Sequence, residues 1–143
     1  MGAKDEENKQ PEEQAADDDN QIMINTIQIK KMRAVQYVQK GEVDYAHELF
    51  AVPLPGPGEV LIKVEAAPIN PSDLYMMQGQ YSGKFTYPLV PGAEGAGTVI
   101  ASGGGFMGRR LMNKRVGFTR QAESGGKFSK NGSYAEYCVT NAY

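Results

Sequence analysis

The residues best suited to chemistry are gathered in the segment 66–81. It carries a carboxamide, a hydroxyl, a carboxylate and a phenol, on Asn70, Ser72, Asp73 and Tyr81. Side-chain amides and hydroxyls can hydrogen-bond a polar substrate, and a phenol can donate a hydrogen bond or a proton. The later segment 91–97 adds a carboxylate, and together the two segments carry most of the function that the sequence predicts.

The chain is a poor match to metal chemistry. A catalytic zinc ion needs about three protein ligands from cysteine, histidine and carboxylate side chains. The sequence has one cysteine, Cys138, and one histidine, His47, in unrelated segments, and Glu94 is a single carboxylate. We therefore expect no zinc. A single cysteine also excludes an internal disulfide bond and fits a reducing compartment.

A strand and a short helix must position the segment 66–81. Residues 59–68 alternate strictly, so we expect a strand whose face with Val60 and Ile62 is buried and whose other face carries Leu61, Lys63 and Glu65. At Asn70 the period changes. Asn70 can cap a helix, Pro71 suits its first position and Gly79 can end it, which predicts a helix over residues 70–78.

Short apolar runs separated by glycines predict further strands over residues 32–38, 45–52, 97–101, 114–119 and 133–140. A glycine-rich run, Gly103-Gly104-Gly105-Phe106-Met107-Gly108, matches the dinucleotide-binding pattern G-x-G-x-x-G. That pattern needs a helix beginning at its third glycine, whereas residues 108–114 predict at most a turn. We therefore expect a strand connection here, inside a small barrel-like β fold with one or two short helices.

The first twenty residues differ from the rest of the chain. They contain eight acidic residues against two lysines, whereas the whole chain has a formal net charge of −2. Almost no large apolar side chain is present there to offset the entropy of ordering. We expect residues 1–24 to form a disordered acidic tail and residues 25–143 to form one domain.

Several classes of protein are excluded by composition. The leader has neither the apolar run of a secretory signal nor the arginines of a mitochondrial presequence, and no stretch approaches about 18 apolar residues. Nothing interleaves basic and aromatic residues as a nucleic-acid binder does. We expect a cytoplasmic protein, with a mitochondrial location as the alternative, and neither a membrane span nor a nucleic-acid partner.

Several ordered motifs resemble the medium-chain dehydrogenase/reductase superfamily, in particular its zinc-independent quinone oxidoreductases and 2-enoyl thioester reductases. The matching segments are Met32-Arg33-Ala34-Val35, the strand 57–64, Ala67-Pro68-Ile69-Asn70-Pro71-Ser72-Asp73, residues 88–99, Lys114-Arg115-Val116 and Gly132-Ser133-Tyr134-Ala135-Glu136-Tyr137. The resemblance implies a GroES-like domain, a partly open β-barrel. It also implies that NADPH is bound mainly by a following Rossmann domain, which this sequence does not contain.

The resemblance also implies roles for individual residues. Zinc-dependent relatives carry a cysteine at the position of Asn70 and a histidine at that of Ala93, which again predicts a zinc-independent protein. Tyr81 matches the tyrosine that serves as proton donor in enoyl reductases. Asn70 matches an asparagine near the nicotinamide and the substrate, and Ser72 matches a relay hydroxyl. Their alternative roles are an exposed loop tyrosine, a helix cap and a first-turn residue.

Two functions from different classes remain open. The first is the substrate-side domain of an NADPH-dependent reductase of quinones, enones or enoyl thioesters, inactive without a Rossmann domain in the same or a second chain. The second is a non-catalytic GroES-like binding or assembly module. In either case the apolar face of a free domain implies a partner domain or a homo-oligomer. The sequence distinguishes neither the substrate nor the oligomeric state.

Overall fold

The computed structural model describes residues 31–39, 42–44, 50–81, 85–120, 122–123, 127–128 and 132–143. The expected acidic tail, the range 45–49 with His47, and Gly41 lie outside these residues. The strands are β1 Lys31–Met32, β2 Gln36–Gln39, β3 Glu42–Asp44, β4 Phe50–Ala51, β5 Glu59–Ala66, β6 Glu94–Ser102, β7 Arg115–Thr119, β8 Ala122–Glu123, β9 Lys127–Phe128 and β10 Tyr137–Asn141. The described helices are α2 Pro71–Met77 and α3 Phe106–Leu111.

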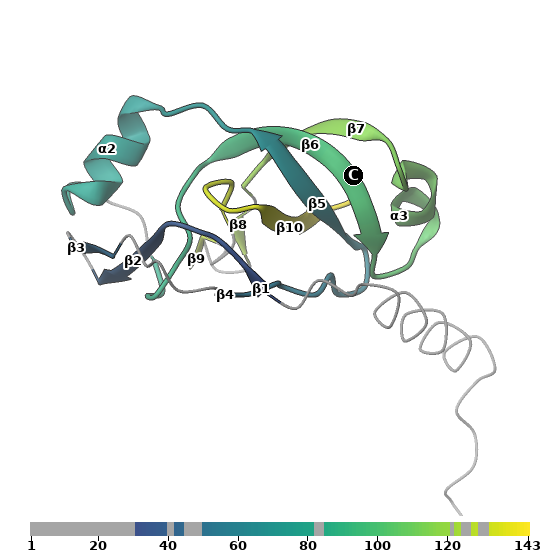
Figure 1. The fold of residues 1–143 in the computed structure, drawn as a ribbon, viewed down its shortest axis with the longest axis horizontal. Coiled ribbons are helices and arrows are strands. Elements are labelled where there is room, and N and C mark those ends of the chain that lie inside the picture. The colour runs from purple at the N-terminus through teal and green to yellow at the C-terminus, as the bar shows by residue number, and fades with distance from the viewer. Residues whose placement is uncertain are drawn as a thin grey trace, which may run out of the picture.

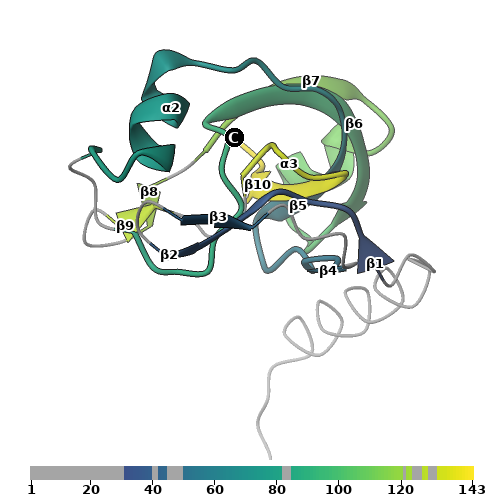
Figure 2. The same cartoon turned by 60° about the vertical axis from the view of Figure 1, so that its left-hand side comes forward.

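The centre of the fold is an antiparallel sheet of four strands in the order β10-β5-β6-β7. Two-stranded pairs β1–β4, β2–β3 and β8–β9 surround it, and isolated bridges join Ala34 to Ala135 and Tyr37 to Leu89. Figure 1 shows the sheet in the middle of the molecule, with α2 and α3 at opposite ends. The second view in Figure 2 shows the strands curving around the interior without closing. The expected mainly-β, partly open fold is confirmed.

β5 is buried on both faces over its first half. Val60 and Ile62 are buried, as expected, in a cluster with Val99 and Ala142. Leu61, on the opposite face, is fully buried too, which the sequence did not predict. It packs in a second cluster with residues that include Met32 of β1, which covers that part of the face, while Lys63 and Glu65 farther along the same face are exposed. A central strand between two apolar layers needs no strict alternation.

The helix predicted after β5 is present as α2. Its N-cap is Asn70, in an extended conformation with φ −95° and ψ 155°, and Pro71 occupies the first helical position. The Asp73 carboxylate accepts a hydrogen bond from the Asn70 backbone N–H at 2.9 Å, so the helix start is satisfied from within. Gly79, with φ 71°, follows the end of the helix, where a residue without a Cβ avoids strain.

The glycine-rich connection contains a helix that the sequence did not predict. α3 begins at Phe106, two positions before Gly108, and has six residues. It links β6 to β7, and these two strands pair antiparallel, from Glu94↔Thr119 to Thr98↔Arg115. A dinucleotide-binding unit instead places its helix between parallel strands. The interpretation of Gly103–Gly108 as a strand connection therefore holds, with a short helix added.

Three other predicted strands have different bounds. The run 32–38 is divided into β1 and β2, because Ala34 bridges across to Ala135 between them. β6 extends in both directions beyond residues 97–101, and β10 covers residues 137–141, which begin later and end one residue later than the predicted 133–140.

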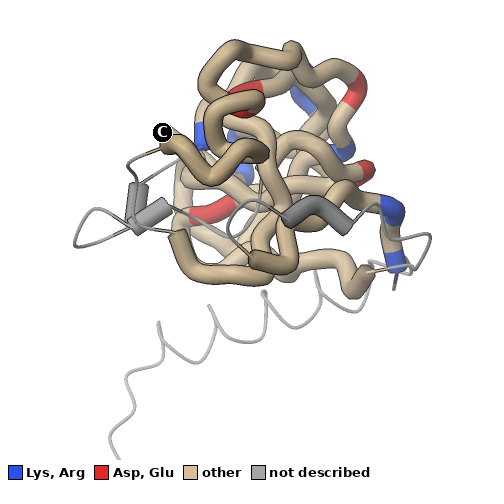
Figure 3. The backbone as a smooth tube through the Cα atoms, turned by 90° about the vertical axis from the view of Figure 1, so that its left-hand side faces the viewer, with Lys and Arg blue, Asp and Glu red and all other residues tan. Residues whose placement is uncertain are grey.

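Basic and acidic residues are scattered over the described part of the chain (Figure 3).

Candidate functional site

The two chemistry-bearing segments meet at one contact. Asn70, at the start of α2, donates a hydrogen bond from Nδ2 to Oε1 of Glu94 at 2.8 Å. Glu94 is the first residue of β6 and its side chain is exposed. From the sequence we interpreted Glu94 as an isolated carboxylate, so this pair was not predicted. One signal was available: zinc-dependent relatives carry potential ligands at positions 70 and 93, which implies that the two segments approach each other.

Ser72 and Tyr81 lie elsewhere around α2. Ser72 is half-buried in the first turn of the helix. Tyr81 lies beyond the other end of α2, with 37% of its surface exposed, and its ring packs against Phe85 at a centroid distance of 5.8 Å. A seven-residue helix is about 10 Å long. The structure therefore brings Asn70 and Glu94 together at the start of α2, whereas Tyr81 follows the end of the helix.

Beneath Asn70 lies a buried carboxylate whose burial the sequence did not predict. Asp73 is 2% exposed, and its Oδ2 also accepts a hydrogen bond from the Tyr134 hydroxyl at 2.9 Å. The same hydroxyl lies 3.0 Å from the backbone oxygen of Pro68, just before α2. Burial and the hydrogen bond to Asp73 raise the pKa of Tyr134 well above its usual range, so the hydroxyl remains a donor. Asp73 and Tyr134 thereby hold the start of α2 against the segment before β10.

A half-buried arginine, whose Nε and Nη1 atoms are buried, holds the segment that leads to Glu94. Arg120 donates its backbone N–H to the oxygen of Ala93 at 2.6 Å and its Nη2–H to the oxygen of Val90. Burial lowers the pKa of Arg120, while the nearby Cys138, Asp73 and Tyr37 act in the opposite direction. A buried cation is costly unless other groups compensate its charge. Arg120 therefore belongs to the same interior polar region as Asp73.

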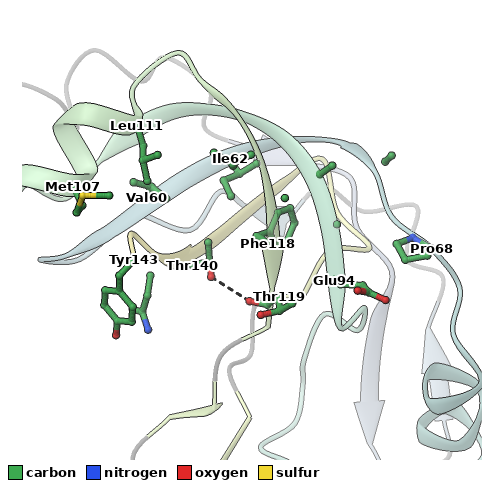
Figure 4. Close-up of a pocket in the computed structure, with 16 residues that line it drawn as sticks. Val60, Ile62, Pro68, Glu94, Met107, Leu111, Phe118, Thr119, Thr140 and Tyr143 are labelled. Carbon is green, nitrogen blue, oxygen red and sulfur yellow. Dashed lines mark hydrogen bonds between the residues drawn. The ribbon is translucent and has the colours of Figure 1, made fainter.

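An apolar cavity of about 640 Å³ is lined at one end by Glu94, the hydrogen-bond partner of Asn70, whereas Asn70, Ser72 and Tyr81 are not among its lining residues. Figure 4 shows Glu94 and Pro68 at the end of this cavity nearest α2 and Tyr143 and Met107 at the other end. The walls come from β5, β6, β7, α3 and β10, through Val60, Ile62, Leu111, Val116, Phe118, Thr119 and Thr140. Apolar walls with a few polar groups at one end are typical of a site for a small organic molecule.

Cys138 is expected to be unreactive in the folded protein. The thiol is buried on β10, and burial raises its pKa to about 12. Because the thiolate is the nucleophile, a shift from about 8.5 lowers the reactive fraction at pH 8 by about three orders of magnitude. We expect alkylation by iodoacetamide to be at least 100-fold slower in the native chain than in 6 M guanidinium. Equal rates in the two states would contradict this burial.

The described residues do not fit zinc or the pyrophosphate of a dinucleotide. Among them no group of three or more histidine, cysteine, aspartate or glutamate side chains is placed to hold a metal ion. An amide at Asn70 and a methyl group at Ala93 occupy the positions where zinc-dependent relatives have a thiol and an imidazole. α3 is too short, and its flanking strands run antiparallel, so Gly103–Gly108 lacks the geometry that holds a pyrophosphate.

Comparisons with known proteins agree with this architecture. Residues 56–143 match the family model of the alcohol dehydrogenase GroES-like domain. Human quinone oxidoreductase is 38% identical over 112 residues, which cover 77% of this chain and 31% of that protein. A zinc-type alcohol dehydrogenase-like protein of Schizosaccharomyces pombe is 40% identical over 94 residues, or 64% of this chain and 26% of that protein.

Solved structures are similar as well. A putative NADPH:quinone reductase from Mesorhizobium loti superposes with a TM-score of 0.65 at 33% identity, over 80% of this chain and 35% of that one. A mycobacterial protein in complex with NADPH gives a TM-score of 0.60 at 32% identity, over 78% and 32%. The chain spans about a third of the length of these matched proteins.

The family follows from the match over more than half of the chain. This protein belongs to the alcohol dehydrogenase GroES-like domain family, within the medium-chain dehydrogenase/reductase superfamily.

Within the described residues, no helix is long and apolar enough to cross a membrane.

Proposed function

We propose that this chain is the substrate-side domain of an NADPH-dependent reductase that acts on a quinone, an enone or an enoyl thioester without zinc. The observation that carries the proposal is the hydrogen bond from Asn70 to Glu94, a residue that lines one end of an apolar cavity of about 640 Å³. The apolar walls suit the carbon skeleton of such a substrate, and the pair offers hydrogen-bonding groups to its carbonyl end. The names of the quinone oxidoreductase relatives support the same substrate class.

A nucleotide-binding Rossmann domain, in the same polypeptide or in a second chain, would complete the site. The described residues hold no pyrophosphate site, so NADPH, which supplies the hydride, is bound by that other domain. Exposed apolar side chains at the α3 end of the cavity support a covering partner: Phe106 is 77% exposed and Met107 42%. Tyr143, which lines the cavity, is 89% exposed. A homo-oligomer is the other arrangement that would cover them.

In this proposal Asn70 and Tyr81 act on the substrate, and Glu94 and Ser72 support Asn70. Asn70 orients the carbonyl group through its amide, and Glu94 fixes the direction of that amide. Tyr81 donates a proton to the reduced substrate, and its ring is held by Phe85. Ser72 supports the first turn beside Asn70. Because Asn70 and Tyr81 flank a helix about 10 Å long, the substrate or the loop around Tyr81 must bridge that distance.

The test compares two tyrosines of the same chain. We would fuse residues 1–143 to the nucleotide-binding domain of a quinone oxidoreductase relative and follow NADPH oxidation with a benzoquinone and with a short enoyl thioester. Tyr81→Phe is expected to lower kcat by about 100-fold or more, because it removes a general acid. Tyr75→Phe, at an exposed tyrosine on α2, is the control and should leave kcat unchanged.

Three outcomes would count against the proposal. Equal turnover in Tyr81→Phe and in the unmodified fusion would remove Tyr81 from the chemistry. A fusion that binds NADPH, is folded and reduces neither substrate would favour the alternative of a non-catalytic GroES-like module. Stoichiometric zinc in the purified protein, measured by elemental analysis, would overturn the zinc-independent assignment.

A further inference from the structure

The polar interior behind the Asn70–Glu94 pair contains atoms that make no hydrogen bond to any other protein atom. Among the described side chains these are Oδ1 of Asp73, Nε and Nη1 of Arg120, and Oγ of Ser133. Asp73 and Ser133 are each 2% exposed. Buried polar atoms are almost always paired, and an unpaired charged group is the most costly case.

These atoms come from one neighbourhood. Ser133 and Tyr134 donate their backbone N–H groups to the oxygens of Gly92 and Pro91, and Arg120 bonds to Val90 and Ala93 of the same segment. Tyr134 in turn bonds to Asp73. The Asp73 charge acts to raise the pKa of Arg120, while Oδ1 of Asp73 and Nε and Nη1 of Arg120 have no hydrogen-bond partner. A buried water molecule with two to four polar partners would satisfy such atoms.

We propose that Arg120 is a positioning residue for the Asn70–Glu94 pair, acting through an ordered internal water that it shares with the Asp73 carboxylate. On one side, Arg120 holds residues 90–93 directly before Glu94. On the other side, Asp73 holds the backbone N–H of Asn70. The water joins these two halves, so that one buried cation and one buried carboxylate set the separation of the two site residues. That this separation matters for binding the substrate rests on the proposed function. The contacts of Arg120 and Asp73 do not depend on it.

The water is tested first, on the unmodified 143-residue chain. NMR with isotope-labelled protein would record cross-relaxation between Arg120 Nε–H and water. We expect a cross-peak of the sign that a long-lived bound water gives. A scalar coupling from Arg120 Nε–H directly to the Asp73 carboxylate would show a direct ion pair in solution and would overturn the shared water. So would the absence of any water cross-peak.

The positioning role is tested with three variants. Arg120→Met removes the cation at similar length, and Arg120→Lys restores a cation. We expect the side-chain amide protons of Asn70 to exchange with solvent about 10-fold faster in Arg120→Met and to recover at least in part in Arg120→Lys. Arg115→Met is the control, because Arg115 pairs with Glu65 at the surface, and it should leave the exchange unchanged.

An unchanged exchange rate in Arg120→Met, or an equal change in Arg115→Met, would overturn the positioning role. If Arg120→Met does not fold, the water cross-peak and the exchange rate in Arg120→Lys still decide the proposal. A lysine that cannot share the water would leave the Asn70 amide protons exchanging faster than in the unmodified chain. None of these measurements involves NADPH or a substrate. Their failure is therefore distinguishable from a failure of the proposed reductase activity.

Discussion

Asp73→Ala is expected to lower the free energy of unfolding by about 3–5 kcal/mol, because it breaks a buried charged network by removing one partner. The substitution leaves the Asn70 N–H without its side-chain acceptor, removes one of the two acceptors of the Tyr134 hydroxyl and removes the carboxylate that compensates Arg120. The higher helix propensity of alanine offsets less than 1 kcal/mol of this loss. Urea denaturation followed by circular dichroism would measure the difference.

Two further variants show whether the loss of stability in Asp73→Ala comes from the buried position of its carboxylate or from the loss of any carboxylate. Glu65→Ala removes a carboxylate that pairs with Arg115 at the surface at 3.0 Å, and we expect a change below about 1 kcal/mol. Tyr134→Phe removes one hydroxyl from the same network and should cost about 1–3 kcal/mol. If Asp73→Ala were no more destabilising than Glu65→Ala, the account of the interior network would be wrong.

The second large effect is expected at Gly97, in the middle of β6. A Cβ at this position would collide with the backbone oxygen and carbon of Lys63 on β5, and with the Ile62 side chain. Backbone atoms of a central strand pair cannot move aside without breaking ladder hydrogen bonds, so the strain is not relieved cheaply. We expect Gly97→Ala to destabilise the domain by about 3 kcal/mol in the same urea experiment.

Gly117 provides a matched control in the next strand. It lies on β7, opposite Ala96 of β6, and a Cβ added there meets nothing within 4 Å. Gly117→Ala should therefore be neutral, or stabilising by up to about 1 kcal/mol through the unfolded chain. Equal destabilisation by the two substitutions would mean that the approach of β5 and β6 at Gly97 is looser than the structure shows.

Local signals in the sequence were sufficient for α2 and for β5. Asn70, Pro71 and Gly79 carry their structural preferences within a few residues, so the helix bounds could be predicted closely. The alternation around Val60 and Ile62 likewise gave the strand. α3 was missed because Gly108 and the three glycines before Phe106 weaken the local helix preference, and it is held by the packing of Leu111 against the core.

Features that depend on distant segments could not be predicted. Leu61 is buried because β1 and β4 cover its face of β5, and nothing near Leu61 encodes that. Asn70 meets Glu94 only because β5 and β6 pair along their length. Asp73 looked like a first-turn residue that favours the helix dipole, whereas its burial requires Tyr134, far along the chain.

The pairing of β5 with β10 has a consequence for how the protein is made. Ile62 of β5 lies opposite Cys138 of β10, so one edge of a strand from the first half of the domain is covered by β10, near residue 140. During synthesis, β5 can pair with β6 while its other edge remains open until β10 leaves the ribosome, several seconds later at about 5–20 residues per second. An open apolar strand edge invites pairing with other chains. The nascent domain is therefore expected to need protection by a chaperone during this interval.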